Sequence, residues 1–525
     1  MNETVKNIRD RYNKAKTGTE NFFSMYKRAY ELCAPNYNNT QPGAFNGQTG
    51  QPQVYDSTVS RAADSFVNTF VTTICPPQTR WMELTPSDEL IDSIAAITGK
   101  DRQDVQENLT EEYQKITDAF FSSLNQSNFY SVIDQFSHDV FVGTGCLLVQ
   151  NSGDYFDSAS PLDFTAIPPL DIAVELSPGQ KITAVFRKQC IRYSQISYVF
   201  PGFDFSVLSD KPSGSGNDYN VELLEACLLD PEFVRLPNGE TTLLRWRYIV
   251  ICNDKIAFET RMANNPFVVF FWSLRQGENV GRGLLTKLLP DAEELQMMVR
   301  LKQKWLQMYG LGSYTAVASQ LLNPAMTKIR PNGVIMVKDQ GAIQPLQPSG
   351  NPQIQQLQIQ ELQQAIKETA LDFMIPNDPR MTATQVQYIA QRQLQIFAGV
   401  VGRIQFQFLW QVVQNSLDIL VNTGYITLPP ELAKIDTKTT KLKILSPIGR
   451  VQFMNDLNSL TTALSMIAQV DPSLVQQYVR TEELPTYIFE QTGSPAKLLR
   501  SAKETKQVQQ QMAQQQQAMM MAQQK

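Results

Sequence analysis

Residues 351–424 constrain the fold most strongly, because they combine two long helical patterns separated by a short loop with proline and arginine. In the first pattern, residues 353–373, apolar side chains recur at steps of three or four with one exception, which is typical of a helix. These side chains are Ile354, Leu357, Leu362, Ile366, Ala370 and Phe373. The opposite face is mostly glutamine. The two helices would span about 30 Å and up to about 60 Å, lengths that a catalytic domain rarely needs.

Composition excludes several classes of protein. The chain has 525 residues and a net charge of −5, so the whole molecule is not a basic protein that wraps nucleic acid. No apolar run approaches the roughly 18 residues of a membrane span, and the first residues lack a signal-peptide core. We therefore expect no membrane contact. We also expect that the protein is made and used in a cytoplasm. Six dispersed cysteines and a single histidine predict reduced core cysteines and no zinc cluster.

The order of patterns along the chain predicts an α+β fold. Helical patterns cover residues 5–32, 57–73, 101–124 and 129–142. From residue 146 to about 274 the chain is rich in β-branched and aromatic residues, which predicts a largely antiparallel sheet. Asn253 and Asp254 separate two such runs and predict a hairpin turn.

Helical pattern resumes after Gly277. Pro290 suits the first turn of a helix that has acidic residues near its start, basic residues near its end and Gly310 as its stop. A compact insert is expected between this helix and the glutamine-faced one.

A second long helix is predicted for residues 382–422, closed by Gly424. Gly399 and Gly402 lie one turn apart within it. Because each glycine costs about 1 kcal/mol relative to alanine in a helix, they predict a kink or close packing. The last residues, 507–525, are rich in glutamine and methionine and predict frayed helix or disorder unless partners supply a bundle.

Motifs of familiar catalytic chemistry are missing from the sequence. Residues 276–283 (QGENVGRG) are rich in glycine but lack the lysine and hydroxyl residue of a phosphate-binding loop. His138 precedes Asp139, and a local hydrogen bond is a simpler interpretation than a general base. No pattern of acidic residues commits the chain to a nuclease. The sequence therefore predicts no catalytic residue, no metal ligand and no cofactor.

Six short segments resemble, in the same order, segments of one family. They are MYKRAYELCAPNY (25–37), PPQTRWMELTP (76–86), GTGCLLV (143–149), GENVGRGLLTKLLPD (277–291), RMTA (380–383) and SPIGRVQ (446–452). The second departs from the family pattern by an inserted Arg80. The chain resembles the portal, or head-to-tail connector, proteins of short-tailed phages, particularly the autographivirus type.

This resemblance implies a portal fold assembled as a ring, with an α/β wing, two long stem helices flanking a small clip, a long kinked helix and a helical crown. The implied parts are the wing (1–275), stem helix 1 (276–309), the clip (310–352), stem helix 2 (353–373), the channel loop (374–382), the long helix returning to the wing (383–445), the crown (446–500) and a Gln-rich tail or barrel (501–525).

The resemblance also implies a function. A dodecameric ring at one capsid vertex of the virion would form a channel for double-stranded DNA, and would assemble in the host cytoplasm. A separate terminase large subunit would package the genome, and the tail would attach for ejection. Implied partners are the major capsid and scaffolding proteins, a tail adaptor and internal core proteins.

Candidate functional residues follow from this architecture. We expect stem glutamines to face the lumen and to offer hydrogen bonds without the strong phosphate binding of lysine or arginine. These glutamines are Gln355, Gln356, Gln360 and Gln363. The alternative is that they face water or a neighbouring helix. In the channel loop, Asp378 and Arg380 are expected nearest to DNA, unless Arg380 caps or pairs with the following helix.

In the clip, the candidates for contact with terminase or tail are Lys328, Arg330 and Lys338, which could equally be solvated surface charges. Two other classes of protein stay open. A helical adaptor or scaffold unrelated to phage heads would show sustained heptads, which proline and glycine interrupt here. A metal-dependent nuclease would cleave DNA, and a portal would not.

Overall fold

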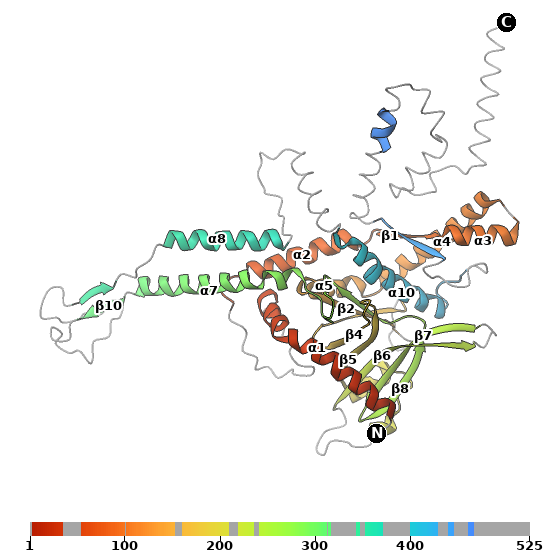
Figure 1. Cartoon of the computed structure of the whole chain (residues 1–525), viewed down its shortest axis with the longest axis horizontal. Coiled ribbons are helices and arrows are strands. Elements are labelled where there is room, and N and C mark those ends of the chain that lie inside the picture. The colour runs from red at the N-terminus through yellow and green to blue at the C-terminus, as the bar shows by residue number, and fades with distance from the viewer. Residues whose placement is uncertain are drawn as a thin grey trace, which may run out of the picture. The chain divides into compact units, whose positions relative to one another are not determined.

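The computed structural model describes twelve stretches of the chain, which form helices and antiparallel strands. They are residues 3–34, 54–99, 101–152, 160–208, 219–235, 241–311, 313–316, 343–346, 352–370, 399–428, 439–445 and 460–466. The chain divides into two compact units, and Figure 1 labels many of their elements. The first comprises Met1–Thr69, Gln126–Pro379 and Ile404–Ile419, and the second comprises Phe70–Asn125, Arg380–Arg403 and Leu420–Lys525. The predicted α+β class is confirmed.

Two antiparallel sheets form the centre of the first unit. The smaller has the order β3-β2-β9 and the larger the order β4-β5-β6-β7-β8. The smaller contains β2 (Thr144–Asn151), β3 (Leu162–Ile167) and β9 (Phe267–Phe271). The larger contains β4 (Ile172–Leu176), β5 (Ile182–Arg192), β6 (Asn220–Arg235), β7 (Thr241–Cys252) and β8 (Lys255–Met262). All these pairings are antiparallel, as predicted.

A hydrophobic core joins the two sheets. Strand β9 reads FVVFF and all its side chains are buried, as expected of a short strand covered on both faces. Cys146 and Leu148 of β2 and Val250 of β7 belong to the same cluster of buried side chains. The other face of the smaller sheet packs on α5 (Phe129–Val142), where the rings of Phe129 and Phe164 meet edge to face with centroids 5.1 Å apart.

Helix α1 (Glu3–Cys33) covers the other face of the larger sheet with its first half. Val5, Ile8 and Ala15 share one helical face and pack with buried residues of the sheet, among them Phe186 and Ile249. A valine or isoleucine side chain contributes roughly 1.5–3 kcal/mol when it is fully buried. The helix predicted for residues 5–32 is confirmed.

The turn between β7 and β8 is the predicted hairpin turn. Asn253 and Asp254 have φ values of 46° and 61°, the left-handed region that both central residues of a type I′ turn require. Asparagine and aspartate tolerate this region better than other non-glycine residues. Between β5 and β6, two short elements, α6 (Tyr193–Val199) and η1 (Phe205–Leu208), add Ile196 and Val207 to the core.

Two long helices of the first unit, α7 (Leu284–Leu311) and α8 (Pro352–Thr369), lie side by side and extend away from its sheets (Figure 1). Strands β10 (Ser313–Ala316) and β11 (Ile343–Leu346) pair antiparallel between them in the sequence. Pro290 lies inside α7 and not in its first turn, so that expectation was wrong. The helix begins earlier because Leu285 and Leu288 are buried, and their packing outweighs the local proline signal.

The second unit contains α3 (Asp88–Thr98), most of α4 (Arg102–Gln126) and a two-stranded sheet. Strand β1 (Met82–Pro86) pairs antiparallel with β12 (Thr440–Ile444), far apart in sequence. Just before β1, the fully buried Trp81 lies edge-on to Phe121, with ring centroids 5.3 Å apart. The sequence did not predict α3, β1 or β12.

Helix α3 has well-defined ends. The Ser87 side chain accepts a hydrogen bond from the Leu90 amide at the start, and Gly99 ends the helix in the left-handed region with φ of 65°. A small apolar cluster joins α3 to α4 through Ile91, Ile94, Val105 and Leu109. Helix α2 (Thr58–Ile74) runs from the first unit into the second.

The long helix predicted for residues 382–422 is described from residue 399 onward. Residues 399–403 are helical, η3 (Ile404–Leu409) is a π-helix, and α10 (Trp410–Asn422) is an α-helix. Gly424 follows with φ of 75°, as expected of the closing glycine. In the first unit, Phe408 of η3 stacks on Phe136 with centroids 4.6 Å apart. Among the helices that the structure describes, none is long and apolar enough to cross a membrane.

Candidate functional site at the start of helix α7

Three of the segments that carry the sequence resemblance meet at the start of α7. Tyr26 comes from α1, Gly143 ends α5 and Thr144 begins β2, and residues 277–283 form the loop that leads into α7. We call this meeting point the α7 joint. The positions of the glycines in the sequence did not predict that these distant segments would meet.

The joint contains a closed cycle of three hydrogen bonds. The Gly281 amide donates to Thr144 Oγ1 over 2.8 Å, and the Tyr26 hydroxyl donates to the Gly281 carbonyl. The Tyr26 and Thr144 hydroxyls lie 3.0 Å apart, so the Thr144 hydroxyl can donate to the Tyr26 oxygen. Each donor is then used once. Burial raises the pKa of Tyr26, so its hydroxyl stays protonated and remains a donor.

Backbone segments approach one another too closely in the joint for any side chain. A Cβ atom at Gly281 would lie 2.3 Å from the Gly143 carbonyl oxygen, and one at Gly143 would lie 2.3 Å from the Gly281 carbonyl oxygen. A Cβ atom at Gly283 would lie 2.2 Å from the Phe141 carbonyl oxygen. These three positions therefore require glycine because of close approach.

Three amides of the glycine-rich loop, those of residues 281–283, are already bonded within the protein, which does not suit a phosphate cradle. Gly281 donates to Thr144, Arg282 donates to the Ser273 carbonyl over 2.7 Å, and Gly283 donates to the Val142 carbonyl over 3.0 Å. A phosphate-binding loop needs free amides that point at the ligand. The glycines of residues 276–283 therefore allow the close backbone packing of the joint.

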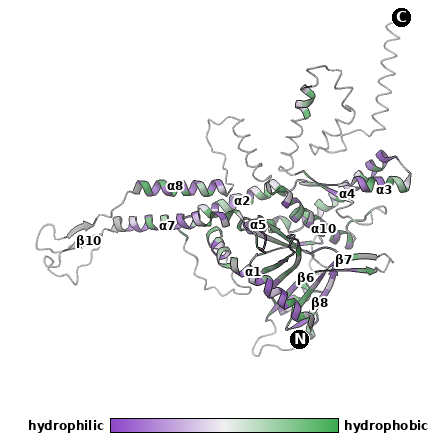
Figure 2. Cartoon of the chain, viewed as in Figure 1, coloured by the Kyte–Doolittle hydropathy of each residue, from purple (hydrophilic) through white to green (hydrophobic). Residues whose placement is uncertain are grey.

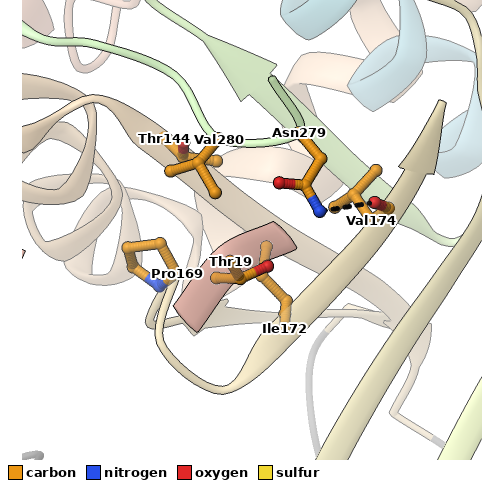
Figure 3. A pocket seen from close by; sticks show the side chains of 7 residues that line it. All are labelled: Thr19, Thr144, Pro169, Ile172, Val174, Asn279 and Val280. Carbon is orange, nitrogen blue, oxygen red and sulfur yellow. Dashed lines mark hydrogen bonds between the residues drawn. The ribbon is translucent and has the colours of Figure 1, made fainter. Parts of the chain in front are cut away.

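Asn279 attaches the same loop to two further elements. Its amide nitrogen donates to the Ala15 carbonyl of α1 over 2.7 Å and to the Val174 carbonyl of β4 over 3.3 Å. A small cavity of about 10 Å³ lies beside it (Figure 3). The residues around this cavity are Thr19, Thr144, Pro169, Ile172, Val174, Asn279 and Val280. This volume is near the minimum for one water molecule and is far too small for a substrate or cofactor.

A buried acid lies close to the joint. Asp139 Oδ1 accepts a hydrogen bond of 2.6 Å from the Tyr30 hydroxyl, and its side chain is fully buried. Burial raises the pKa of Asp139 well above its usual value, with a smaller contribution from Asp171. Tyr26 and Tyr30, one turn apart on α1, thus both bond to the segment that runs from the end of α5 into β2.

His138 has no partner typical of a catalytic base among the described residues. Its nearest acid is Asp64, with 3.7 Å between Nε2 and Oδ1, and its Nδ1 is buried without a hydrogen bond. Burial lowers the pKa of His138, so the ring is neutral near pH 7. The expected local hydrogen bond is thus not seen in the described part of the chain.

All six cysteines are free thiols and five are buried, as predicted. Cys190 is exposed, which corrects the expectation that all six are core residues, because it lies near the end of β5 beyond the packed part of the sheet. In the described ranges no three residues among histidine, cysteine, aspartate and glutamate are placed to hold a metal ion.

The predicted stem glutamines have different environments on α8. Gln356 accepts a hydrogen bond from Lys302 of α7, and Gln363 Nε2 donates to Asp56 Oδ2 over 2.8 Å. Gln355 is half-buried and Gln360 is exposed. Two of the four therefore bond to their own chain. Whether any of them faces a lumen stays a prediction.

The apolar stripe predicted for this helix needs a correction. Ile359, Ile366 and Ala370 are buried, whereas Ile354 and Leu357 are 55% and 58% exposed. The buried face of α8 differs from the predicted stripe because α8 packs along α7. This face of α8 includes half-buried glutamines. Figure 2 shows hydrophobic segments alternating with hydrophilic ones along both helices.

Exposed apolar residues also lie on α7. Met297, 62% exposed, and Leu301 are one turn apart and share a face of the helix, and Leu306 is half-exposed. A different face of α7 holds the segment before α2: Gln296 Oε1 accepts from the Tyr55 amide over 2.7 Å, and the Arg300 guanidinium lies 5.5 Å from the Tyr55 ring centroid.

Several predicted site residues lie outside the described residues. These are Asp378 and Arg380 of the channel loop, and Lys328, Arg330 and Lys338 of the clip. Gly399 and Gly402 are described, and a Cβ atom at either would meet nothing within 4 Å. Close packing at these glycines is therefore not seen among the described residues. A kink there stays a prediction.

The described residues of the first unit thus include a tightly packed joint and a long helix pair. The chain belongs to the family of bacteriophage head to tail connecting proteins, whose family model matches residues 5–499. A comparison with curated proteins found no match. Membership of this structural family fits a protein that is not an enzyme.

Proposed function

We propose that copies of this chain assemble into a dodecameric ring that forms the portal at one vertex of a phage capsid. Family membership supports a phage portal role that connects head and tail components. In the proposed ring, DNA enters through the central channel under the action of a terminase, and the tail docks for ejection. Capsid, scaffolding and internal core proteins are the proposed neighbours in the virion, and assembly takes place in the host cytoplasm.

The observation that carries this proposal is the α7–α8 pair with apolar side chains on its exposed surface. Met297, Leu301, Ile354 and Leu357 are all exposed on this pair. Single exposed apolar residues are normal, but several on one helix pair support an interaction surface there. A neighbouring copy is the proposed occupant, because a closed ring repeats one head-to-tail interface in every subunit.

The remaining parts take their proposed roles from this assembly. Residues 1–275 form the wing, 276–309 and 353–373 the stem, 310–352 the clip, and 446–500 the crown. Glutamines of the stem helix 353–373 line the lumen, and the exposure of Gln360 supports this orientation. Amides hydrogen-bond without fixed positive charge, so packaged DNA slides past them.

The channel loop 374–382 is the proposed point of closest contact with DNA. Arg380 would form a ring of one cation per subunit that holds phosphates transiently, with Asp378 beside it, and clip residues Lys328, Arg330 and Lys338 would contact terminase or tail. In the test, Arg380→Ala particles are compared with a Lys367→Ala control on α8. We expect normal rings with altered genome packaging or retention for Arg380→Ala alone. Failure of Arg380→Ala to form rings would contradict the channel-loop role.

A helical adaptor and a metal-dependent nuclease remain the competing functions. The purified chain is incubated with double-stranded DNA and Mg²⁺ or Mn²⁺. The portal proposal predicts intact DNA, and metal-dependent cleavage that persists through purification would favour the nuclease.

A further inference from the structure

One side of α1 lies along the loop 277–283 and the start of α7. Four of the contacting residues, at positions 15, 18, 22 and 26, recur at helical spacing and share a face of α1. The Asn279 side chain donates to the Ala15 carbonyl and lies over Gly18. The Phe22 ring lies 5.6 Å from the Arg282 guanidinium, and the Tyr26 hydroxyl donates to the Gly281 carbonyl. Arg28 lies off this face and reaches α7 with its long side chain, where Arg28 Nε lies 3.1 Å from Glu293 Oε1.

The first half of the same helix is fixed to the larger sheet. Val5 and Ile8 are buried against it, and Arg11 makes an ion pair of 2.9 Å with Glu175 of β4. Helix α1 is continuous from Glu3 to Cys33, so its two halves move together. It therefore connects the larger sheet to the base of α7 through a second route besides the chain itself.

The loop that α1 covers has the composition of a hinge. Gly277 has φ of +85°, and Gly281 and Gly283 carry no side chain that could restrict the backbone. Small residues in a loop next to a long helix can absorb large changes of backbone angle.

We propose that α1 acts as a clasp on this glycine hinge, so that its docking fixes the direction of the α7–α8 pair relative to the two sheets. The hinge is closed by the hydrogen-bond cycle of Tyr26, Thr144 and Gly281, and by the bond from Asn279 to Ala15. Opening of these contacts frees the hinge while α1 stays packed on the larger sheet. Any partner that opens them thereby changes the direction of α7 and α8. This coupling operates in a single chain and does not depend on ring formation.

The clasp is tested by hydrogen exchange on the full chain carrying Tyr26→Phe, which removes one hydroxyl and keeps the ring. The amides of residues 281–283 donate to Thr144 Oγ1 and to the Ser273 and Val142 carbonyls, so their exchange reports opening of the hinge. Loss of the bond leaves the Gly281 carbonyl unpaired, and we expect exchange in residues 277–289 to become about tenfold faster. Exchange in β5, β6 and β7 should stay unchanged.

Tyr12→Phe is the matched control, since Tyr12 lies on the same helix but packs on Phe186 of the sheet, with ring centroids 5.9 Å apart. It should leave exchange in residues 277–289 unaltered. Asn279→Ala provides a second opening variant that acts from the loop side. Unchanged exchange in residues 277–289 in both opening variants would overturn the proposal, as would an equal acceleration in all peptides. A chain that stays monomeric would contradict the ring while leaving this test valid.

Discussion

Tyr26 of α1 donates a hydrogen bond to the carbonyl oxygen of Gly281, a residue 255 positions further along the chain. The same carbonyl lies against Gly143, which ends α5, so three distant segments share one contact point. Helix α7 begins only three residues after Gly281. These contacts hold the loop that leads directly into the long helix pair of the first unit.

Alanine at Gly281 or Gly283 should destabilise the chain strongly. The added Cβ would lie 2.3 Å and 2.2 Å, respectively, from a backbone carbonyl oxygen, and backbone cannot move aside as a flexible side chain can. We expect a loss of at least about 2 kcal/mol for each, measured as a lowered midpoint of thermal or denaturant unfolding. Gly179→Ala is the control, since its nearest neighbour is the Ser177 hydroxyl at 3.9 Å, and it should change little. A Gly281→Ala chain as stable as the control would refute the close approach.

Replacement of Asp139 by asparagine should change how stability depends on pH. Burial raises the pKa of Asp139 in the folded chain, so the acid is stable there in its neutral form. The contribution of Asp139 to the free energy of unfolding is fully present below its pKa in the unfolded chain, about 3.9. It is lost as the pH rises towards its pKa in the folded chain. Asparagine cannot ionise, so Asp139→Asn should gain stability relative to the parent chain between pH 4 and pH 8.

Unfolding midpoints across this pH range measure the effect of Asp139→Asn. Asp10→Asn, at an exposed position of helix α1, is the control and should give a curve parallel to the parent chain. A constant difference in unfolding midpoint between Asp139→Asn and the parent at all pH values would contradict this prediction. It would show that the pKa of Asp139 is the same in the folded and unfolded states.

Ser87→Ala should weaken the start of α3. The Ser87 hydroxyl accepts a hydrogen bond from the Leu90 amide over 3.2 Å, and loss of such a cap costs about 1 kcal/mol. Ser93→Ala, an exposed change within the same helix, should stay within about 0.5 kcal/mol. Denaturant unfolding followed by helical circular dichroism compares the two. Equal effects would mean that the cap is not what stabilises this end.

Leu301→Asp should prevent assembly without unfolding the subunit. Leu301 is 40% exposed on α7, so a charge there is hydrated in the monomer but would be buried against a neighbouring copy. Gln303→Asp adds the same charge at another exposed position of α7 and is the control. Light scattering should show smaller particles for Leu301→Asp alone, with both unfolding midpoints unchanged. Rings of normal size would place the subunit interface elsewhere.

Sequence patterns predicted the elements that local signals define. The periodicity of α5 gave its bounds, Phe129–Val142, and Asn253-Asp254 gave the β7–β8 turn. Helix α7 shows where local signals fail, because its start depends on buried leucines that outweigh Pro290. The pairing of β1 with β12 joins residues hundreds of positions apart, and a single sequence carries no register for it.

The joint was only half visible in the sequence. Glycines at 143, 281 and 283 stood out within two resembling segments, yet nothing in their spacing indicated that they would touch each other. Tyr26 carried no signal either, because an aromatic residue on a helix is normally a core residue. Its hydroxyl acquires its role only when Thr144 and the Gly281 carbonyl are brought to it.

The most direct test of the portal proposal is the mass and symmetry of the purified full-length protein, by native mass spectrometry together with negative-stain electron microscopy. The account predicts a ring of about twelve subunits with a central hole, closed by one repeated interface. The account would be contradicted if the assembled form were an open filament or a two-fold dimer and if Leu301→Asp left that form unchanged.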